Sequence, residues 1–299
     1  MMWLGIDIGG TNTKVALLDD AASSILEHTS VPTDRSHASA AVRRAAELSA
    51  AWVGRHPDIA GVGVTIPGHF DAVTGCSTIV PNIPGPWLGL PVRDMVADAA
   101  RRPTTLINDA RAFGLAESRL GAARNSENVV ALVLGTGVGG AIVLGGQLYS
   151  GQGGLAGEIG HMVLKVDGPP CGCGNRGCLE SLTRADVLAE NAGTDTVADA
   201  VSRARNGDQR AMDAIDAAAR WMGIGLANVA TLLTPNAIVI GGGIAQAGDV
   251  LFRPLREELA LRSPLLSPSS YRLLPAELGT IAGAVGAATL AHDSRKTSG

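Results

Sequence analysis

The chain has 299 residues, of which 46% are hydrophobic and 17% charged, and this predicts a soluble globular protein large enough for about two domains. Its net charge of −4, without long basic runs, argues against nucleic acid as the main partner. The longest apolar run, residues 129–144, is interrupted by glycines and is shorter than the ~20 residues of a membrane span, and the first residues do not resemble a secretory signal. We therefore expect a cytoplasmic protein with no membrane partner.

Residues 3–19, "WLGIDIGGTNTKVALLD", predict two strands joined by a glycine turn. The backbone N–H groups of such a turn, beside the carboxylate of Asp7, suit phosphate oxygens and a hydrated Mg²⁺ ion. The alternative is an ordinary hairpin with a Gly-Gly turn. The motif alone does not decide between them.

Strands and helices alternate through the next hundred residues, which predicts an α/β fold with a mainly parallel or mixed sheet. Asp109 stands where a strand passes into a helix, so its simplest interpretation is a helix N-cap. The expected elements are a helix over 39–53, a strand over 59–66, a Pro67-Gly68 turn, a helix over 92–100, a strand over 104–107 and a helix over 110–121.

A second glycine-turned hairpin follows at residues 129–149, "VVALVLGTGVGGAIVLGGQLY", and two copies of one plan suggest two similar domains. Gly135 to Gly140 match the dinucleotide-binding pattern G-x-G-x-x-G. That pattern must open a helix, whereas an apolar strand follows here, so we predict a second phosphate-binding hairpin.

The last third of the chain predicts three buried elements. Apolar residues between 212 and 233 recur at spacings of three and four, which indicates a helix buried along one face. "PNAIVIGGGIA" (235–245) predicts a buried strand that ends in three glycines, and "GTIAGAVGAATLAH" (279–292) predicts a helix of small residues.

Three of the four cysteines fall within ten residues, "CGCGNRGCLE". Three thiols cannot pair off, and a tetrahedral metal site needs a fourth ligand from elsewhere. In a reducing compartment such a cluster more often binds metal than forms disulfides. Reduced thiols without a metal are the alternative, and Cys76 is expected to be a small buried apolar residue.

Several motifs together resemble the ROK family (repressors, open reading frames, kinases) within the actin-like phosphotransferases, and its bacterial glucokinases and related hexose kinases in particular. In chain order they are "DIGGTNTK", "GVGVTIPG", "PNIPGPW", "INDARAFGLAE", "LVLGTGVGGAIV", "GEIGHM", "CGCGNRGCLE" and "IVIGGG". The resemblance implies an α/β, two-domain actin-like (ribonuclease H-like) sugar kinase fold with an interdomain cleft. The expected N-terminal domain, residues 1–110 with 281–299, holds the first phosphate hairpin and the catalytic aspartate. Residues 111–280 hold the second hairpin, the zinc loop and the nucleotide-binding glycines.

The resemblance further implies ATP-dependent phosphorylation of the 6-hydroxyl of glucose or a close relative, with Asp109 as general base. Mg²⁺ would accompany ATP, and His161 would complete a structural zinc site with Cys171, Cys173 and Cys178. The implied sugar-binding residues are Gly68, Asn108, Asp109, Glu158, His161 and Glu180, and the implied nucleotide-binding or phosphate-binding residues are Asp7, Gly9, Gly10, Thr11, Lys14, Gly135, Thr136, Gly137, Gly241 and Gly242.

Other functions stay open at this stage. Thr183 and Arg184 after Glu180, and Arg111 after the Asn-Asp pair, depart from common family patterns, so another hexose, an N-acetylhexosamine or a polyphosphate donor are alternatives. A non-enzymatic alternative is a sugar-sensing regulator. Such members carry a DNA-binding domain ahead of the first hairpin, for which the position of Asp7 leaves no room. The resemblance also implies a homodimer or homotetramer.

Overall fold

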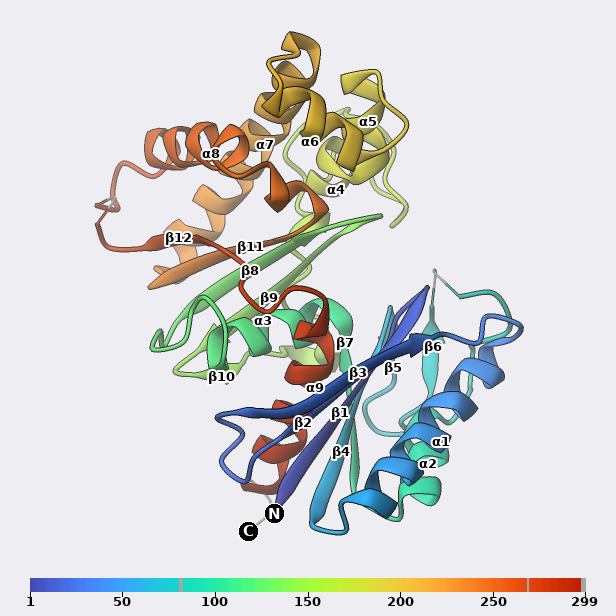
Figure 1. Ribbon diagram of the computed structural model, residues 1–299. Helices are drawn as coiled ribbons and strands as arrows, with labels where there is room; N and C mark the ends of the chain where they lie inside the picture. Colours follow the sequence, from blue (N-terminus) through green and yellow to red (C-terminus); the bar gives the residue numbers. More distant parts are fainter. Residues whose placement is uncertain (81–82, 268, 297–299) are drawn as a thin grey trace. The chain divides into compact units, whose positions relative to one another are not determined.

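The computed structural model describes residues 1–80, 83–267 and 269–296, so Pro81 and Asn82 of the "PNIPGPW" motif lie outside the described residues (Figure 1). The described chain forms two compact units. Unit 1 comprises residues 1–124, 150–155 and 278–299, and unit 2 comprises residues 125–149 and 156–277.

Unit 1 is built on a five-stranded mixed sheet of order β3-β2-β1-β4-β7. The first three strands pair antiparallel as a meander, whereas β1, β4 and β7 run parallel. Their bounds are β1 Met2–Ile8, β2 Asn12–Leu18, β3 Ile25–Pro32, β4 Ile59–Ile66 and β7 Thr104–Asn108. A separate two-stranded ribbon pairs β5 (His69–Phe70) with β6 (Ser77–Ile79).

Helices cover both faces of this sheet (Figure 1). α1 (Ala38–Arg55) and α2 (Val92–Ala100) pack on one face, and α3 (Asp109–Arg119) packs with α9 (Ala282–Lys296) on the other. Two glycines let α9 approach closely: a Cβ at Gly5 would lie 1.8 Å from the Ala284 carbonyl oxygen. A Cβ at Gly63 would lie equally close to that of Ala287. The small residues of α9 therefore pack directly on the strands.

Unit 2 repeats the arrangement of unit 1 with a sheet of order β10-β9-β8-β11-β12. β8, β11 and β12 run parallel, and β8-β9-β10 form the antiparallel meander. The strands are β8 Val129–Leu134, β9 Val138–Leu144, β10 Gln147–Leu148, β11 Ala237–Gly242 and β12 Arg272–Pro275. The two glycine-turned hairpins are confirmed in both units.

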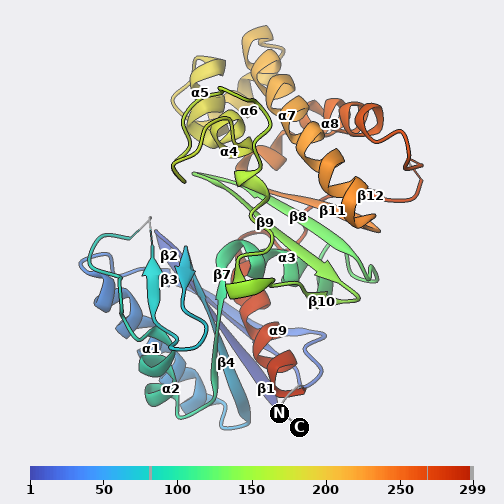
Figure 2. The ribbon, with the colours of Figure 1, turned by 180° about the vertical axis from the view of Figure 1, so that it is seen from behind.

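The helices of unit 2 surround the long helix α7 (Gln209–Leu233), whose predicted apolar stripe is buried in the core. Figure 2 shows α7 packed beside α8 (Asp249–Arg262). The shorter helices are α4 Leu179–Thr183, α5 Ala185–Ala192 and α6 Val197–Arg205. The 3₁₀ turns are η1 Gln152–Gly154 and η4 Gly279–Ile281 in unit 1, and η2 Ile159–His161 and η3 Gly243–Ala247 in unit 2.

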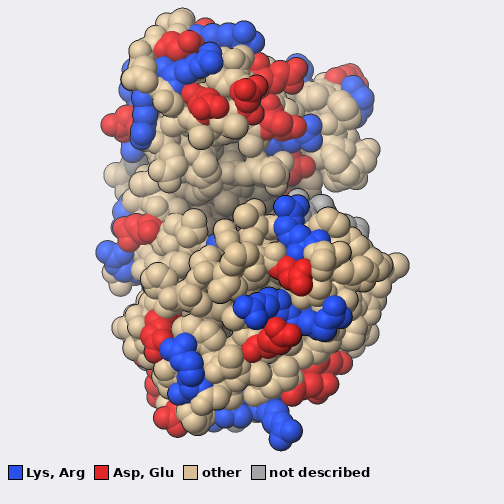
Figure 3. Space-filling model, turned by 45° about the vertical axis from the view of Figure 1, so that its right-hand side comes forward, with Lys and Arg blue, Asp and Glu red and all other residues tan. Residues whose placement is uncertain are grey.

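Most predicted elements are present. α2 has the predicted bounds, and α1 begins one residue before and ends two residues after the predicted helix. The unit boundaries differ from the expected domain limits, because α3 packs against α9 and so belongs to unit 1. Among the helices in the described part of the chain, none is long and apolar enough to cross a membrane. On the face drawn in Figure 3, positive and negative side chains are interspersed.

Candidate active site

Three polar side chains of unit 1, those of Asp7, Asn108 and Asp109, lie at the carboxyl ends of the parallel strands β1 and β7, which flank β4. Asp7 near the end of β1 is in register with Thr65 of β4, and Ile66 of β4 is in register with Asn108 at the end of β7. The carboxyl edge of a parallel sheet is where α/β proteins bind ligands. The strand register alone therefore gathers Asp7, Asn108 and the following Asp109 at one edge of the sheet.

Asp7 is held by two neighbours and is 8% exposed. Thr65 Oγ1 donates a hydrogen bond of 2.5 Å to one carboxylate oxygen, and Lys14 Nζ lies 3.1 Å from the other. A Cβ at Gly283 of α9 would lie 2.7 Å from the Asp7 carboxyl carbon, so only glycine fits there. Asp7 is thus a fixed carboxylate that Lys14 partly neutralises.

In the turn after Asp7, Gly9 and Gly10 are half-buried and Thr11 is exposed. Gly9 N donates to the Asn12 carbonyl at 3.2 Å, and a Cβ at Gly9 would lie 2.6 Å from that oxygen. Thr33, the residue directly after β3, donates a hydrogen bond from Oγ1 to the Gly9 carbonyl at 2.8 Å and so fixes the turn. The turn is therefore tight and preorganised, as a phosphate-binding turn requires.

Asn108 is the N-cap of α3, which corrects the expectation that Asp109 caps the helix. Asn108 Oδ1 accepts from the backbone N–H groups of Ala110 at 3.0 Å and Arg111 at 3.2 Å, and its Nδ2 donates to the Gly68 carbonyl at 3.0 Å. Asp109 is the first helical residue, with Oδ1 2.9 Å from the N–H of Ala110. Because Asn108 does the capping, the carboxylate of Asp109 stays available for chemistry.

The pKa of Asp109 is raised from 3.8 to about 6. Desolvation by the surrounding protein is the largest cause, although the side chain itself reaches solvent, and the negative charge of Asp7 is the second. The N–H of Ala110 and the charge of Arg111 oppose the shift. Asp109 therefore remains ionised at neutral pH, with a higher proton affinity than an ordinary aspartate.

In unit 2, the turn of Gly135, Thr136 and Gly137 joins β8 to β9 and contacts Glu180. Glu180 Oε2 accepts from the backbone N–H of Val138 at 2.9 Å, and a Cβ at Gly137 would lie 2.6 Å from that oxygen. The predicted sugar-binding Glu180 therefore lies directly against the predicted phosphate-binding turn.

Gly241 and Gly242 end β11 beside the strand that leads into this turn, in register with Val133 and Leu134. Gly242 has φ 88°, and a Cβ there would lie 1.8 Å from the Leu134 carbonyl oxygen. The predicted glycines of both segments thus meet at the carboxyl edge of the second sheet, where glycine alone permits the approach.

An apolar slot of about 50 Å³ opens beside these glycines, and its walls were not foreseen from the sequence. Thr183 is buried and donates to the Leu179 carbonyl at 2.8 Å, so its hydroxyl is already used. The short helices α4, α5 and α6, which lie apart from the glycine motifs in sequence, supply half of the lining residues. The slot is lined by Leu134, Gly135, Thr183, Ala185, Leu188, Val197, Gly243 and Ile244.

The fourth ligand suggested by the family resemblance does lie with the three cysteines. The ligand atoms of His161, Cys171, Cys173 and Cys178 all lie within 4.8 Å of one another. Cys173 Sγ and Cys178 Sγ are 3.8 Å apart, and His161 Nδ1 is 3.6 Å from Cys171 Sγ. Zinc bond lengths in a tetrahedron require about 3.8 Å between two sulfurs and about 3.6 Å between nitrogen and sulfur. The cluster therefore fits a four-coordinate zinc ion.

The cysteine loop is linked by hydrogen bonds to the segment that carries His161 and Glu158. Leu179 N donates to the Met162 carbonyl at 2.9 Å, and Cys171 Sγ lies 3.5 Å from Glu180 Oε1. His161 Nε2, the nitrogen that faces away from the cysteines, lies 3.9 Å from Glu158 Oε2. Glu158, His161 and Glu180 are thus gathered at the Cys/His cluster within unit 2.

Comparisons with known proteins agree with this geometry. A family model described as the ROK family matches residues 3–294. The glucokinase of Halalkalibacterium halodurans is 33% identical over 311 residues, covering 95% of this chain and 93% of that protein. The ROK hexokinase structure from Thermus thermophilus has a TM-score of 0.90 at 34% identity, covering 99% of this chain and all of that one.

A second solved structure is a ROK family glucokinase from Streptomyces griseus in complex with glucose and AMPPNP. It has a TM-score of 0.80 at 31% identity and covers 98% of this chain and all of that one. Both structures are ROK sugar kinases with the actin-like two-domain fold. The chain described here belongs to the ROK family, has the actin-like two-domain fold and is a sugar kinase.

Proposed function

We propose that the protein transfers the γ-phosphoryl group of ATP to the 6-hydroxyl of glucose or a close relative, with Asp109 as general base. The observation that carries this proposal is the placement of Asp109 directly after β7, where Asn108 and not Asp109 is the N-cap of α3, together with a pKa raised to about 6. A base with a pKa just below neutrality is both ionised and able to accept a proton.

In the reaction, the sugar hydroxyl oxygen forms a bond to the γ-phosphorus while the bond from that phosphorus to the ADP oxygen breaks. An alcohol is a weak nucleophile at neutral pH, so its proton passes to Asp109 as the new bond forms. The released ADP oxygen carries the negative charge, which backbone N–H groups of the glycine turns and the Mg²⁺ that accompanies ATP would neutralise. Positioning of the two substrates supplies much of the remaining rate enhancement.

The phosphate groups would be bound by the two glycine turns. In unit 1, Gly9, Gly10 and Thr11 present the turn, and Asp7 would bind hydrated Mg²⁺ that accompanies ATP. Lys14 is held against Asp7 and can pair with phosphate oxygens. In unit 2 the corresponding groups come from residues 135–137 and from Gly241 and Gly242.

An edge of the nucleoside base would enter the apolar slot beside Gly135 and Gly243, since a slot of about 50 Å³ admits only part of a base. The slot lies next to the second glycine turn, where a nucleotide bound through its phosphates would place its base. A polyphosphate chain has no apolar part to fill such a slot, so the slot supports ATP as the donor rather than polyphosphate.

The sugar would be bound by two groups of residues. Unit 1 supplies Gly68, Asn108 and Asp109, which the bond from Asn108 Nδ2 to the Gly68 carbonyl already links. Unit 2 would supply Glu158, His161 and Glu180, gathered at the Cys/His cluster. Carboxylates accept strong hydrogen bonds from sugar hydroxyls, which supports these assignments.

The zinc ion would be structural, because four protein ligands leave no open position for water. Burial raises the pKa of the Cys171 thiol to about 12, and a bound cation would instead favour the thiolate. The reduced thiols of this cluster also support a cytoplasmic location. We further propose a homodimer or homotetramer, which light scattering of the purified protein would test.

A coupled assay with a panel of hexoses and N-acetylhexosamines, run with ATP and with polyphosphate, tests the function. Glucose or a close relative with ATP should give the highest kcat/KM, and phosphorus NMR should place the phosphate on the 6-oxygen. Absence of phosphorylation with every sugar and both donors would exclude the proposal and favour a sugar-binding regulator.

A further inference from the structure

One row of side chains crosses three adjacent strands of the unit 1 sheet at Asp7. The strand register places Lys14 of β2 opposite Asp7 of β1 on one side, and Thr65 of β4 opposite it on the other. Side chains in register on adjacent strands lie on the same face of a sheet, so they can contact one another. The pairing of the strands therefore brings Thr65 and Lys14 to the carboxylate proposed above to bind Mg²⁺.

Each oxygen of the Asp7 carboxylate has one donor in this row. Thr65 Oγ1 donates to Oδ1 at 2.5 Å, and Lys14 Nζ donates to Oδ2 at 3.1 Å. A carboxylate offers about four acceptor positions, so roughly two stay open to further donors. The water molecules that Mg²⁺ retains when it binds to proteins are donors of this kind. The row therefore leaves acceptor positions for a hydrated metal ion while it fixes the direction of the carboxylate.

The hydroxyl of Thr65 serves Asp7 alone. Thr65 is 0% exposed, and within the described part of the chain its hydroxyl makes no hydrogen bond besides the one to Asp7. Burial of a hydroxyl group costs free energy unless it is hydrogen-bonded, and a valine of nearly the same shape would avoid that cost. Packing alone therefore does not account for a threonine at this position, whereas the bond to Asp7 does.

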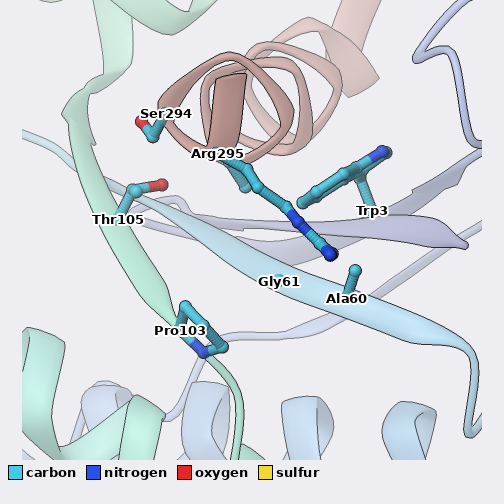
Figure 4. Close-up of a pocket in the computed structure, with 8 residues that line it drawn as sticks. Trp3, Ala60, Gly61, Pro103, Thr105, Ser294 and Arg295 are labelled. Carbon is cyan, nitrogen blue, oxygen red and sulfur yellow. The ribbon is translucent and has the colours of Figure 1, made fainter. Parts of the chain in front are cut away.

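The opposite end of β4 has a different environment. Ala60 and Gly61, at the start of this strand, line a cavity of about 390 Å³ together with Pro103, which directly precedes β7 (Figure 4). Thr65 is the last residue but one of β4, and its side chain meets Asp7 instead. The bond to Asp7 thus belongs to the carboxyl edge of the sheet, where the proposed phosphate turn begins.

We propose that Thr65 is a positioning residue for the Mg²⁺ ion that accompanies the nucleotide, an inference that rests on the proposed function. An aspartate carboxylate rotates easily about its last side-chain bond unless a partner holds it. Thr65 holds Oδ1, so Asp7 presents only one oxygen to the ammonium group of Lys14. Without this bond the carboxylate can turn both oxygens to Lys14, and its charge is then less available to the metal ion.

The test compares nucleotide binding with and without the metal ion. Calorimetry of the full chain gives the dissociation constant of AMPPNP, once with Mg²⁺ and once in buffer without Mg²⁺, and neither measurement needs turnover. Thr65→Val should weaken Mg-AMPPNP binding at least ~5-fold and change metal-free AMPPNP binding less than ~2-fold. Thr65→Ser keeps a hydroxyl group and should bind Mg-AMPPNP within ~2-fold of the unmodified protein.

Two further comparisons separate positioning from folding. Thr289→Val is the matched control, because Thr289 is also 0% exposed in unit 1 and its hydroxyl donates to the Val285 carbonyl within α9 at 2.9 Å. It should leave both dissociation constants unchanged. In an Asp7→Asn background, Thr65→Val should cause no further loss of Mg-AMPPNP affinity, because both changes act on the same carboxylate. Thr65→Ala removes the same hydroxyl and replaces Thr65→Val if that variant does not fold.

Equal weakening of AMPPNP binding with and without Mg²⁺ in Thr65→Val would show a merely structural role and overturn the proposal. A Thr65→Ser variant as weak as Thr65→Val would do so as well, and so would unmodified protein that binds AMPPNP equally well with and without Mg²⁺. The proposed function is tested separately by the coupled sugar assay. A failure there leaves these dissociation constants measurable, so the two failures are distinguishable.

Discussion

The negative charge of Asp7 helps to raise the pKa of Asp109 to about 6. The two carboxylates lie at the same edge of one sheet, one near the end of β1 and one directly after β7. One is proposed to bind the metal ion of the nucleotide, and the other to accept the proton of the sugar. Their proximity thus links the charge at the phosphate site to the basicity of the catalytic group.

The pH profile of kcat/KM for the sugar should show this link. Because only ionised Asp109 accepts a proton, kcat/KM should fall about tenfold per pH unit below an inflection near 6. Asp7→Asn removes the smaller of the two causes, so its inflection should move below that of the unmodified enzyme, while desolvation, the larger cause, keeps it above the ordinary value of 3.8. An inflection in the unmodified enzyme at 4 or lower would contradict the assignment of the base.

The same pKa predicts how Asp109→Asn changes activity and stability. Phosphorylation should fall by at least ~10², while sugar binding measured by calorimetry persists, because the amide keeps the shape but accepts no proton. A carboxyl group with a raised folded-state pKa stabilises the fold when protonated, and this contribution is lost as pH rises through about 6.

Asp109→Asn should therefore raise the free energy of unfolding at pH 7.5 by about 1 kcal/mol, after allowance for solvent screening of this exposed side chain, and leave it unchanged at pH 3.5. Chemical denaturation at the two pH values measures this. Near-normal turnover, or a destabilised variant at pH 7.5, would count against the proposed role.

The sequence predicted the fold well where local signals were strong. Glycine turns marked both hairpins, and α2 is present at its predicted bounds. β3 was missed because it alternates between exposed and half-buried residues, as an edge strand does, and offers no apolar run. The short helices α4, α5 and α6 were missed because few apolar residues mark each one.

The candidate site was likewise predicted only where a strong local signal marks its residues. The Cys/His cluster and the glycine turns follow from compact motifs. The capping by Asn108 could not be separated from capping by Asp109, because both residues suit an N-cap and only the backbone geometry decides. The apolar slot joins residues 134–135, 183–197 and 243–244, which only the tertiary fold brings together.

Replacement of Asp7 by alanine should separate nucleotide use from sugar binding. The variant loses the proposed Mg²⁺ ligand and leaves Lys14 without its carboxylate partner, so KM for Mg-ATP should rise at least ~10-fold. Sugar binding measured by calorimetry should persist, since Gly68 and Asn108 keep their own hydrogen bond. Equal loss of both substrates would indicate a folding defect and not a phosphate-site role.

The purified protein should hold one zinc ion per chain, measurable by elemental analysis. Cys173→Ser should lose the zinc and raise the sugar KM at least ~10-fold, because the loops with Glu158, His161 and Glu180 are then no longer fixed. The melting temperature should change little, since each unit has its own apolar core. Cys76→Ser is the matched control, and an unchanged sugar KM in Cys173→Ser would refute the proposal.

The apolar slot predicts weak discrimination between nucleoside bases. Three polar groups on its walls are already engaged: Gly135 N donates to the Gly137 carbonyl, the Gly135 carbonyl accepts from Ala185 N at 3.0 Å, and the Thr183 hydroxyl donates to the Leu179 carbonyl. An apolar site distinguishes ligands poorly, whereas a site with hydrogen bonds to the base does so strongly. GTP should therefore support phosphorylation with a kcat/KM within ~10-fold of that for ATP.

Gly243→Val tests the location of the base. A Cβ at Gly243 would meet no atom within 4 Å, and its φ lies outside the left-handed region, so a valine can occupy the slot without backbone strain. KM for ATP should rise at least ~10-fold while the sugar KM changes little, because the side chain takes the space of the base. Gly54→Val, at an equally open glycine of α1, is the control. If Gly243→Val left KM for ATP unchanged, or if ATP were preferred over GTP by more than ~100-fold, the base would have to bind elsewhere or through hydrogen bonds that the slot does not offer.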